Sequence, residues 1–92
     1  NAAGMGAFIH QDLSERLHGV TGVRDIRGQG LMIGIELDRP CAALVQQALA
    51  RRLLINVTAE SVVRLLPPLI LGQEEAALLT RQLAELIKAH QT

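Results

Sequence analysis

Arg64 is the residue whose type and setting best suit binding chemistry, because it stands inside an apolar run. Two valines precede it, two leucines follow it, and Pro67 and Pro68 then end the run. β-Branched residues followed by a proline pair are typical of a short strand. A guanidinium is costly to bury without an anion, and its planar fork matches a carboxylate. Two interpretations stay open: a carboxylate-binding arginine, or one that faces solvent or pairs with a structural acid.

The other basic and nucleophilic side chains lack the neighbours that a reactive site needs. His10 and His18 have no converging ligands, so we expect surface or hydrogen-bonded histidines. Cys41 is the single cysteine, and a nearby helix N-terminus could lower its thiol pKa. No neighbouring His or second Cys supports reactivity there, so we interpret Cys41 as a packing residue. The pattern predicts no catalytic, metal-binding or cofactor-binding residue.

The single lysine, Lys88, stands in the last turn of an expected helix. A lysine that forms a Schiff base needs a desolvated, crowded pocket, and the neighbouring residues 89–91 do not offer one. Glycines 28, 30 and 34 form no dinucleotide fingerprint, because their spacing is wrong and a strand follows them instead of a helix. We expect a tight hairpin connection at 28–30 instead.

The amino-acid composition disfavours several classes of binding protein. The 92 residues carry 9 basic and 9 acidic side chains, and this balance disfavours nucleic-acid and membrane-surface binding. One Phe and no Tyr or Trp argue against a base-stacking or sugar-binding surface. No apolar run approaches the roughly 18 residues that span a bilayer, and no signal peptide is visible. We therefore expect a cytoplasmic protein, and the absence of an initiator Met at Asn1 suggests a piece of a longer chain.

Three amphipathic helices and four strands are expected from hydrophobic periodicity. The helices cover 5–17, Pro40 to Arg52, and the segment after the capping residue Gly72, with a buried stripe in each. The expected strands are 23–28, 31–37, 53–57 and 62–66.

The resulting order, α-β-β-α-β-β-α, predicts an α+β two-layer fold with helices on one face of a small, mainly antiparallel sheet. Side chains alternate between the two faces of a strand, so every second residue of the strands is expected on the face without helices. We expect that bare face to be a docking or substrate surface. The pairing of the 53–57 strand is left open. The expected bare-face residues are Met32, Gly34, Val62, Arg64 and Leu66.

The whole chain, 1–92, resembles the C-terminal small domain of class III (fold type I) pyridoxal-phosphate aminotransferases. The resemblance is carried by VRDIRGQGLMIGIEL at 23–37, by LLINVTAESVVRLLPPLIL at 53–71, and by the EEAALLTRQLAELI helix. It implies a single domain cut from a longer enzyme whose large domain holds pyridoxal 5'-phosphate and the Schiff-base lysine. The partners it implies are that large domain, a second subunit of a homodimer, and an amino-acid or 2-oxo-acid substrate.

The resemblance also assigns a role to Arg64, which stands where the family's arginine binds the substrate α-carboxylate. Within the class, the similarity is greatest to the branch that transfers the amino group of N-acetylornithine to 2-oxoglutarate in arginine biosynthesis. Ornithine, succinylornithine and 4-aminobutyrate remain alternative donors. We expect the fragment alone to be inactive and to bind no cofactor. The alternative from another class is a stand-alone α+β module that binds a ligand or regulates another protein.

Overall fold

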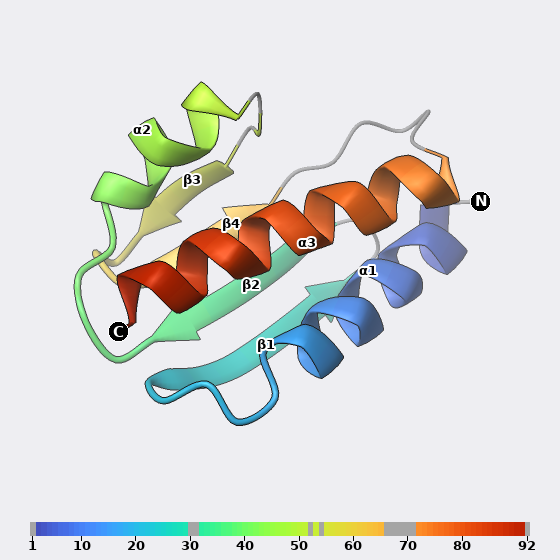
Figure 1. Cartoon of the computed structure of the whole chain (residues 1–92). Helices are drawn as coiled ribbons and strands as arrows, with labels where there is room; N and C mark the ends of the chain where they lie inside the picture. Colours follow the sequence, from blue (N-terminus) through green and yellow to red (C-terminus); the bar gives the residue numbers. More distant parts are fainter. Residues whose placement is uncertain (1, 30–31, 52, 54, 66–71, 92) are drawn as a thin grey trace.

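The computed structural model describes residues 2–29, 32–51, 53, 55–65 and 72–91. These residues form three helices and four strands in the predicted order α-β-β-α-β-β-α, as Figure 1 shows. The elements are α1 (Ala2–Arg16), β1 (Val23–Gln29), β2 (Met32–Leu37), α2 (Ala43–Ala50), β3 (Ile55–Thr58), β4 (Val62–Leu65) and α3 (Gln73–His90).

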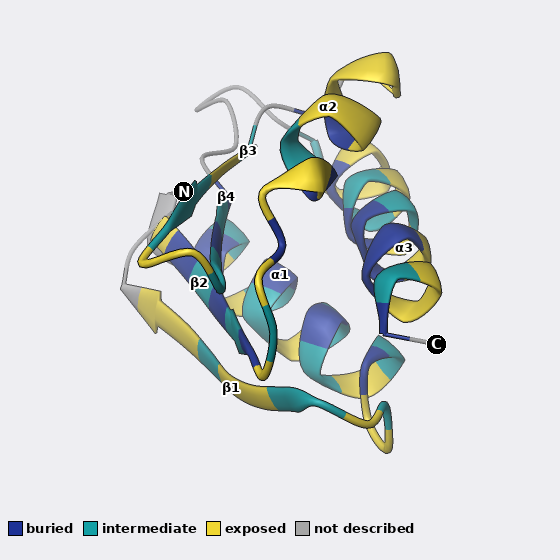
Figure 2. Cartoon of the chain, turned by 90° about the vertical axis from the view of Figure 1, so that its left-hand side faces the viewer, coloured by how far each residue is buried: buried dark blue, intermediate teal, exposed yellow. Residues whose placement is uncertain are grey.

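The four strands form one antiparallel sheet with the order β1-β2-β4-β3. Strand β4 therefore lies between β2 and β3, although β3 precedes it in sequence. This order settles the pairing of the 53–57 segment, since β3 is an edge strand paired with β4 alone. The helices lie on one side of the sheet, as predicted, and the other side carries none of the described helices (Figure 2).

Alternation along the two central strands decides which side chains enter the core. Ile33 and Ile35 on β2, and Val63 and Leu65 on β4, are buried under the helices. Removing each such aliphatic side chain from water contributes about 1.5–3 kcal/mol to folding. The predicted face of β2 is confirmed, apart from Leu31, which lies outside the described residues.

The helices complete the core with most of the stripes that their periodicity predicts. In α2, Leu44 and Ala48 are buried, but Leu49, which the periodicity assigns to the same stripe, is exposed. The stripe of α3 differs from the prediction in two ways. Thr80 and Ala84 are buried in addition to the predicted residues, and Leu79, predicted to be buried, is only partly so. The buried helix residues are Ile9, Leu13, Leu44, Ala48, Ala76, Thr80, Leu83, Ala84, Leu86 and Ile87.

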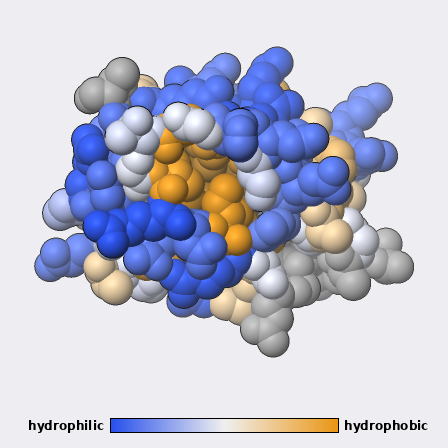
Figure 3. Space-filling model, turned by 90° about the horizontal axis from the view of Figure 1, so that it is seen from below, coloured by the Kyte–Doolittle hydropathy of each residue, from blue (hydrophilic) through white to orange (hydrophobic). Residues whose placement is uncertain are grey.

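The core is less completely covered between α1 and β1. Val23 and Ile26 on β1, and Phe8 on α1, are only partly buried against it. Figure 3 views the molecule from this side and shows apolar atoms at the bottom of a hollow whose rim is hydrophilic. The apolar core is therefore partly open to solvent on this side.

Helix α2 begins later than the sequence predicts. It starts at Ala43 instead of Pro40, and Arg51 is its C-terminal cap instead of part of its last turn. The Cys41 backbone N–H donates to the Glu60 carbonyl at 2.8 Å, so this segment is held to the β3–β4 turn before the helix begins. Arg52, predicted to end the helix, lies outside the described residues.

The β3–β4 hairpin and the start of α3 follow the prediction within two residues. β3 runs from Ile55 to Thr58 instead of 53–57, and the turn after it holds Ala59 and Glu60 at positive φ. Gly72 caps α3, and its N–H donates to the Glu75 side chain at 3.2 Å, which satisfies one otherwise free donor.

Candidate functional site

Arg64 lies in the middle of β4 on the helix-free face of the sheet. Its neighbours Val63 and Leu65 are fully buried toward the helices. Because successive side chains of a strand point to opposite faces, the Arg64 side chain projects from the other face, where it is half-buried. The alternation that builds the core therefore also places this cation on the open face.

Strand register sets the neighbours of Arg64. Its Cα partners are Gly34 on β2 and Asn56 on β3, and Gly34 is in turn paired with Arg27 on β1. Directly paired residues share a face, so these four form one row across the open side of the sheet. The row thus contains two arginines, Arg27 and Arg64, and the residue between them is Gly34, which has no side chain.

A depression of about 470 Å³ lies over three members of this row, Arg27, Gly34 and Arg64. Its lining combines the two arginines with apolar and small residues, as expected for a site that binds a small molecule through few polar groups. Of the predicted bare-face residues, Met32, Gly34, Val62 and Arg64 line it, whereas Leu66 lies outside the described residues. The lining residues are Arg27, Gly28, Met32, Ile33, Gly34, Thr58, Val62, Arg64 and Leu65.

The two arginines of the row differ in their partners. The Arg27 Nε donates to Asp25 Oδ2 at 2.8 Å, and its Nη2 donates to Glu36 Oε1. Arg64 takes part in none of the ion pairs found among the described residues, although four other arginines do. Within that part of the chain, Arg64 is thus a half-buried cation that lacks a carboxylate.

Sequence reasoning did not find Arg27. The alternation of Asp25 and Arg27 along β1 does put them on one face. That this face is also the Arg64 face follows only from the register with β2. The motif RGQG around Arg27 gave no chemical signal by itself.

The two histidines and the cysteine considered in the sequence lie in places that suggest no reactive site. His10 Nε2 lies 2.8 Å from the Ile26 carbonyl oxygen and links α1 to β1, while His18 is exposed. Cys41 is fully buried, and burial raises the pKa of its thiol. The lowered pKa considered for a cysteine near a helix start is therefore not found, and packing is its role.

Lys88 decides whether this chain can hold pyridoxal phosphate. It is the only lysine in the sequence and is exposed on α3, which covers the face of the sheet opposite to Arg64. No lysine lies near the depression, so its described lining offers no amine that could form a Schiff base with the cofactor. Any cofactor chemistry would need residues from elsewhere.

Neither a metal centre nor a membrane span is found among the described residues. They contain no group of three His, Cys, Asp or Glu side chains that could hold a metal ion. None of the helices in that part of the chain combines the length and the hydrophobicity needed to cross a bilayer.

Comparison with known proteins gives this geometry a context. A family model described as aminotransferase class-III matches residues 1–87. Acetylornithine aminotransferase 1 of Bordetella bronchiseptica is 57% identical over 88 residues, which are 96% of this chain and 22% of that protein. Acetylornithine aminotransferase of Nitrosomonas europaea is 48% identical over 87 residues, 95% of this chain and again 22% of the relative.

Solved structures agree with the sequence comparison. Ornithine delta-aminotransferase of Plasmodium falciparum superposes with a TM-score of 0.89 at 27% identity, covering 98% of this chain and 24% of that one. The chain thus spans about a fifth to a quarter of the length of the proteins that it matches.

Proposed function

The chain belongs to the class-III aminotransferase family, and on that premise we propose that it is the C-terminal small domain, residues 1–92, of an acetylornithine aminotransferase. The complete enzyme would transfer the amino group of N-acetylornithine to 2-oxoglutarate in arginine biosynthesis. The names and the identities of the relatives support this assignment. Pyridoxal 5'-phosphate would be held by the large domain, where it supplies the electron sink for the reaction.

Within that enzyme, Arg64 would bind the substrate α-carboxylate. The observation that carries this role is its position: a half-buried guanidinium over an open depression, outside every ion pair among the described residues. Its planar fork can donate two parallel N–H bonds to a carboxylate. Apolar neighbours such as Val62 reduce competition from water and so strengthen the charge–charge interaction.

One arginine can serve both half-reactions, because the amino donor and 2-oxoglutarate both carry a carboxylate next to the reacting carbon. The same contact would fix that carbon relative to the cofactor in each case. Arg64 would therefore bind and orient both substrates without any proton transfer of its own.

The helix-free face would be completed by other parts of the protein. The chain spans only 22% of its curated relatives, so most of the enzyme would lie in a large domain that faces Arg64. We also propose that the enzyme is a cytoplasmic homodimer.

Steady-state kinetics of the complete enzyme test the role of Arg64. Arg64→Ala should lower kcat/KM for N-acetylornithine and for 2-oxoglutarate alike. Leaving a carboxylate without its charged partner costs about 2–5 kcal/mol, which corresponds to roughly 30-fold to several thousand-fold. Arg64→Lys should recover part of the loss, because it keeps the charge but not the two-pronged geometry.

The matched control is Arg81→Ala, which removes an exposed arginine from α3 on the other side of the sheet. It should leave both kcat/KM values unchanged. Normal kinetics for Arg64→Ala with both substrates would reject the assigned role.

The amino donor is tested by comparing kcat/KM for N-acetylornithine, ornithine, succinylornithine and 4-aminobutyrate. The highest value should belong to N-acetylornithine, and a clear preference for another donor would reassign the branch. Reading the complete gene tests the alternative of a stand-alone module. An open reading frame that encodes a large α/β domain upstream supports the enzyme, and one limited to these 92 residues would exclude it.

A further inference from the structure

The glycine between the two arginines has no explanation in the fold itself. Gly34 is not among the described glycines with positive φ, which are Gly19 and Gly22. A Cβ built on Gly34 would meet only Val62 Cγ1, at 3.9 Å, which is ordinary van der Waals contact. Glycine in the interior of a strand weakens it, and a β-branched residue would suit this position better. Neither backbone conformation nor crowding therefore requires glycine at 34.

What Gly34 does provide is space between two cations. It is the Cα partner of Arg27 on one side and of Arg64 on the other. Neighbouring strands lie about 4.8 Å apart, so the backbones of the two arginines are separated by about 10 Å. All three residues line the same depression, whose floor at its centre is bare main chain.

Arg27 and Arg64 lie on opposite sides of this space, but only Arg27 has carboxylate partners among the described residues. Asp25 and Glu36 form the adjacent row of the sheet and both accept hydrogen bonds from the Arg27 guanidinium. These bonds fix the orientation of Arg27 and balance its charge. A ligand carboxylate would therefore pair with Arg64, while the fixed Arg27 limits the space on the β1 side.

We propose that Gly34 makes room for substrate at the carboxylate site: the space above its main chain admits the acid end of an amino-acid or 2-oxo-acid substrate beside Arg64. A side chain at position 34 would occupy that space and exclude the ligand. The inference rests on the carboxylate-binding role proposed for Arg64.

Substitution of Gly34 in the complete enzyme tests the proposal. Gly34→Val should raise KM for both N-acetylornithine and 2-oxoglutarate on the order of tenfold to a hundredfold, and Gly34→Ala should have a smaller effect. The change in kcat should be small by comparison, because the side chain blocks binding and not the chemical step. The Kd of 2-oxoglutarate, measured by calorimetry, should rise in parallel with KM.

Arg24→Val is the matched control, since it places the same β-branched side chain at an exposed β1 position that is outside the lining of the depression. It should leave KM unchanged. The Tm and the cofactor absorbance of Gly34→Ala should match those of the parent enzyme, since a Cβ at position 34 meets only Val62 Cγ1, at 3.9 Å.

The possible results separate the two proposals. Unchanged KM in Gly34→Val, together with a large loss in Arg64→Ala, would overturn the inference and leave the function of Arg64 standing. No loss in Arg64→Ala would overturn the proposed function itself. A lower Tm and kcat in Gly34→Val at unchanged KM would show that this face contacts another part of the protein at Gly34, and would also overturn the inference.

Discussion

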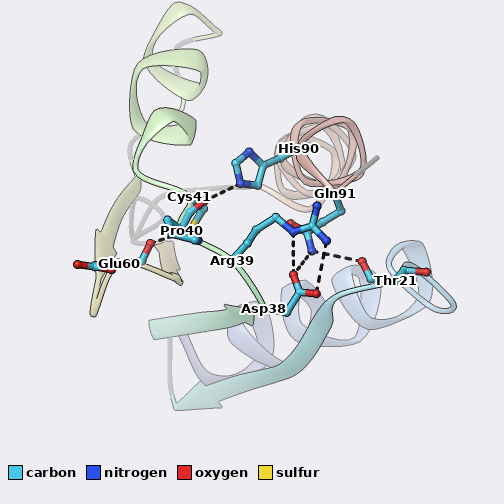
Figure 4. Close-up of polar contacts among 8 residues, drawn as sticks. All are labelled: Thr21, Asp38, Arg39, Pro40, Cys41, Glu60, His90 and Gln91. Atoms are coloured by element: carbon cyan, nitrogen blue, oxygen red, sulfur yellow. Dashed lines mark hydrogen bonds and ion pairs between the residues drawn. The ribbon is translucent and has the colours of Figure 1, made fainter.

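Gly22, in the turn before β1, lies against the side chain of Gln91 just beyond α3: a Cβ on Gly22 would stand 2.1 Å from Gln91 Nε2. That nitrogen donates to the Thr21 carbonyl at 3.3 Å and to Asp38 Oδ1 at 3.0 Å. Figure 4 shows these contacts beside the bond from His90 to the Pro40 carbonyl. The end of α3 is thereby joined to the α1–β1 turn and to the segment after β2.

This contact predicts that Gly22→Ala destabilises the chain more than Gly19→Ala. Both glycines have positive φ, so both substitutions cost about 1–2 kcal/mol of backbone strain. A Cβ at Gly19 meets nothing within 4 Å, whereas at Gly22 it collides with Gln91 and Asp38. Chemical denaturation should show an extra loss of about 1–3 kcal/mol for Gly22→Ala. Equal losses for the two variants would contradict this packing.

The Asp38 carboxylate should make the thermal stability of the folded chain depend on pH. Hydrogen bonds from Arg39 and Gln91 lower the pKa of Asp38 from 3.8 to about 2. Because the folded pKa lies below the unfolded one, the stabilisation is present above about pH 4 and is lost as the pH falls toward 2. Asp38→Asn should therefore show a smaller drop in Tm between pH 4 and pH 2 than the parent. Parallel Tm profiles for the two proteins would show that this carboxylate is not coupled to folding.

Cys41 should react slowly in the folded chain. The thiol is fully buried, its pKa is raised by burial, and its Sγ lies 3.6 Å from the Glu60 carbonyl oxygen. Since the thiolate is the reactive form, modification by a thiol reagent at pH 8 should be slow until denaturant unfolds the chain. Rates that are the same with and without denaturant would rule out this burial.

Thr80 is a buried polar residue in the contact between α3 and α1. Its hydroxyl oxygen lies within hydrogen-bond distance of Asp12 Oδ2 and is 3.0 Å from the Ala77 carbonyl oxygen. Thr80→Val keeps the shape but leaves Asp12 with Arg16 as its remaining side-chain partner, and should cost about 1–2 kcal/mol.

A double-mutant cycle with Asp12→Asn isolates the Thr80–Asp12 interaction, read from denaturation curves. The loss in the double variant should be smaller than the sum of the two single losses. Strict additivity would show that the two side chains do not interact.

Local periodicity made most of the elements predictable. The alternation of Ile33, Gly34 and Ile35, and of Val63, Arg64 and Leu65, is enough to put the cation opposite the core. Side-chain direction in a strand depends only on neighbours along the chain, so sequence suffices for it. The helix stripes are predicted less completely: Leu49 follows the period of α2 but is exposed, and Thr80, a polar residue, is buried with a bond to a distant carboxylate.

The predicted start of α2 was wrong by three residues, because the chain forms a tighter turn after Pro40 before the helix begins. Pro40 is compatible with a helix start, but Cys41 uses its N–H for a bond to Glu60, which no local rule indicates. The Leu44 N–H then donates to the Cys41 carbonyl at 2.9 Å and the Val45 N–H to the Ala42 carbonyl at 3.1 Å; these tighter bonds precede the helix, which starts at Ala43.

The sequence by itself determined the element order, the two-layer arrangement and the face on which Arg64 lies. Only the tertiary structure decided that β4 inserts between β2 and β3, and hence that Gly34 separates Arg64 from Arg27. Which strands pair, and in which register, depends on the combined packing of segments far apart in the chain. A periodic pattern fixes the face of a side chain but not its neighbours across the sheet.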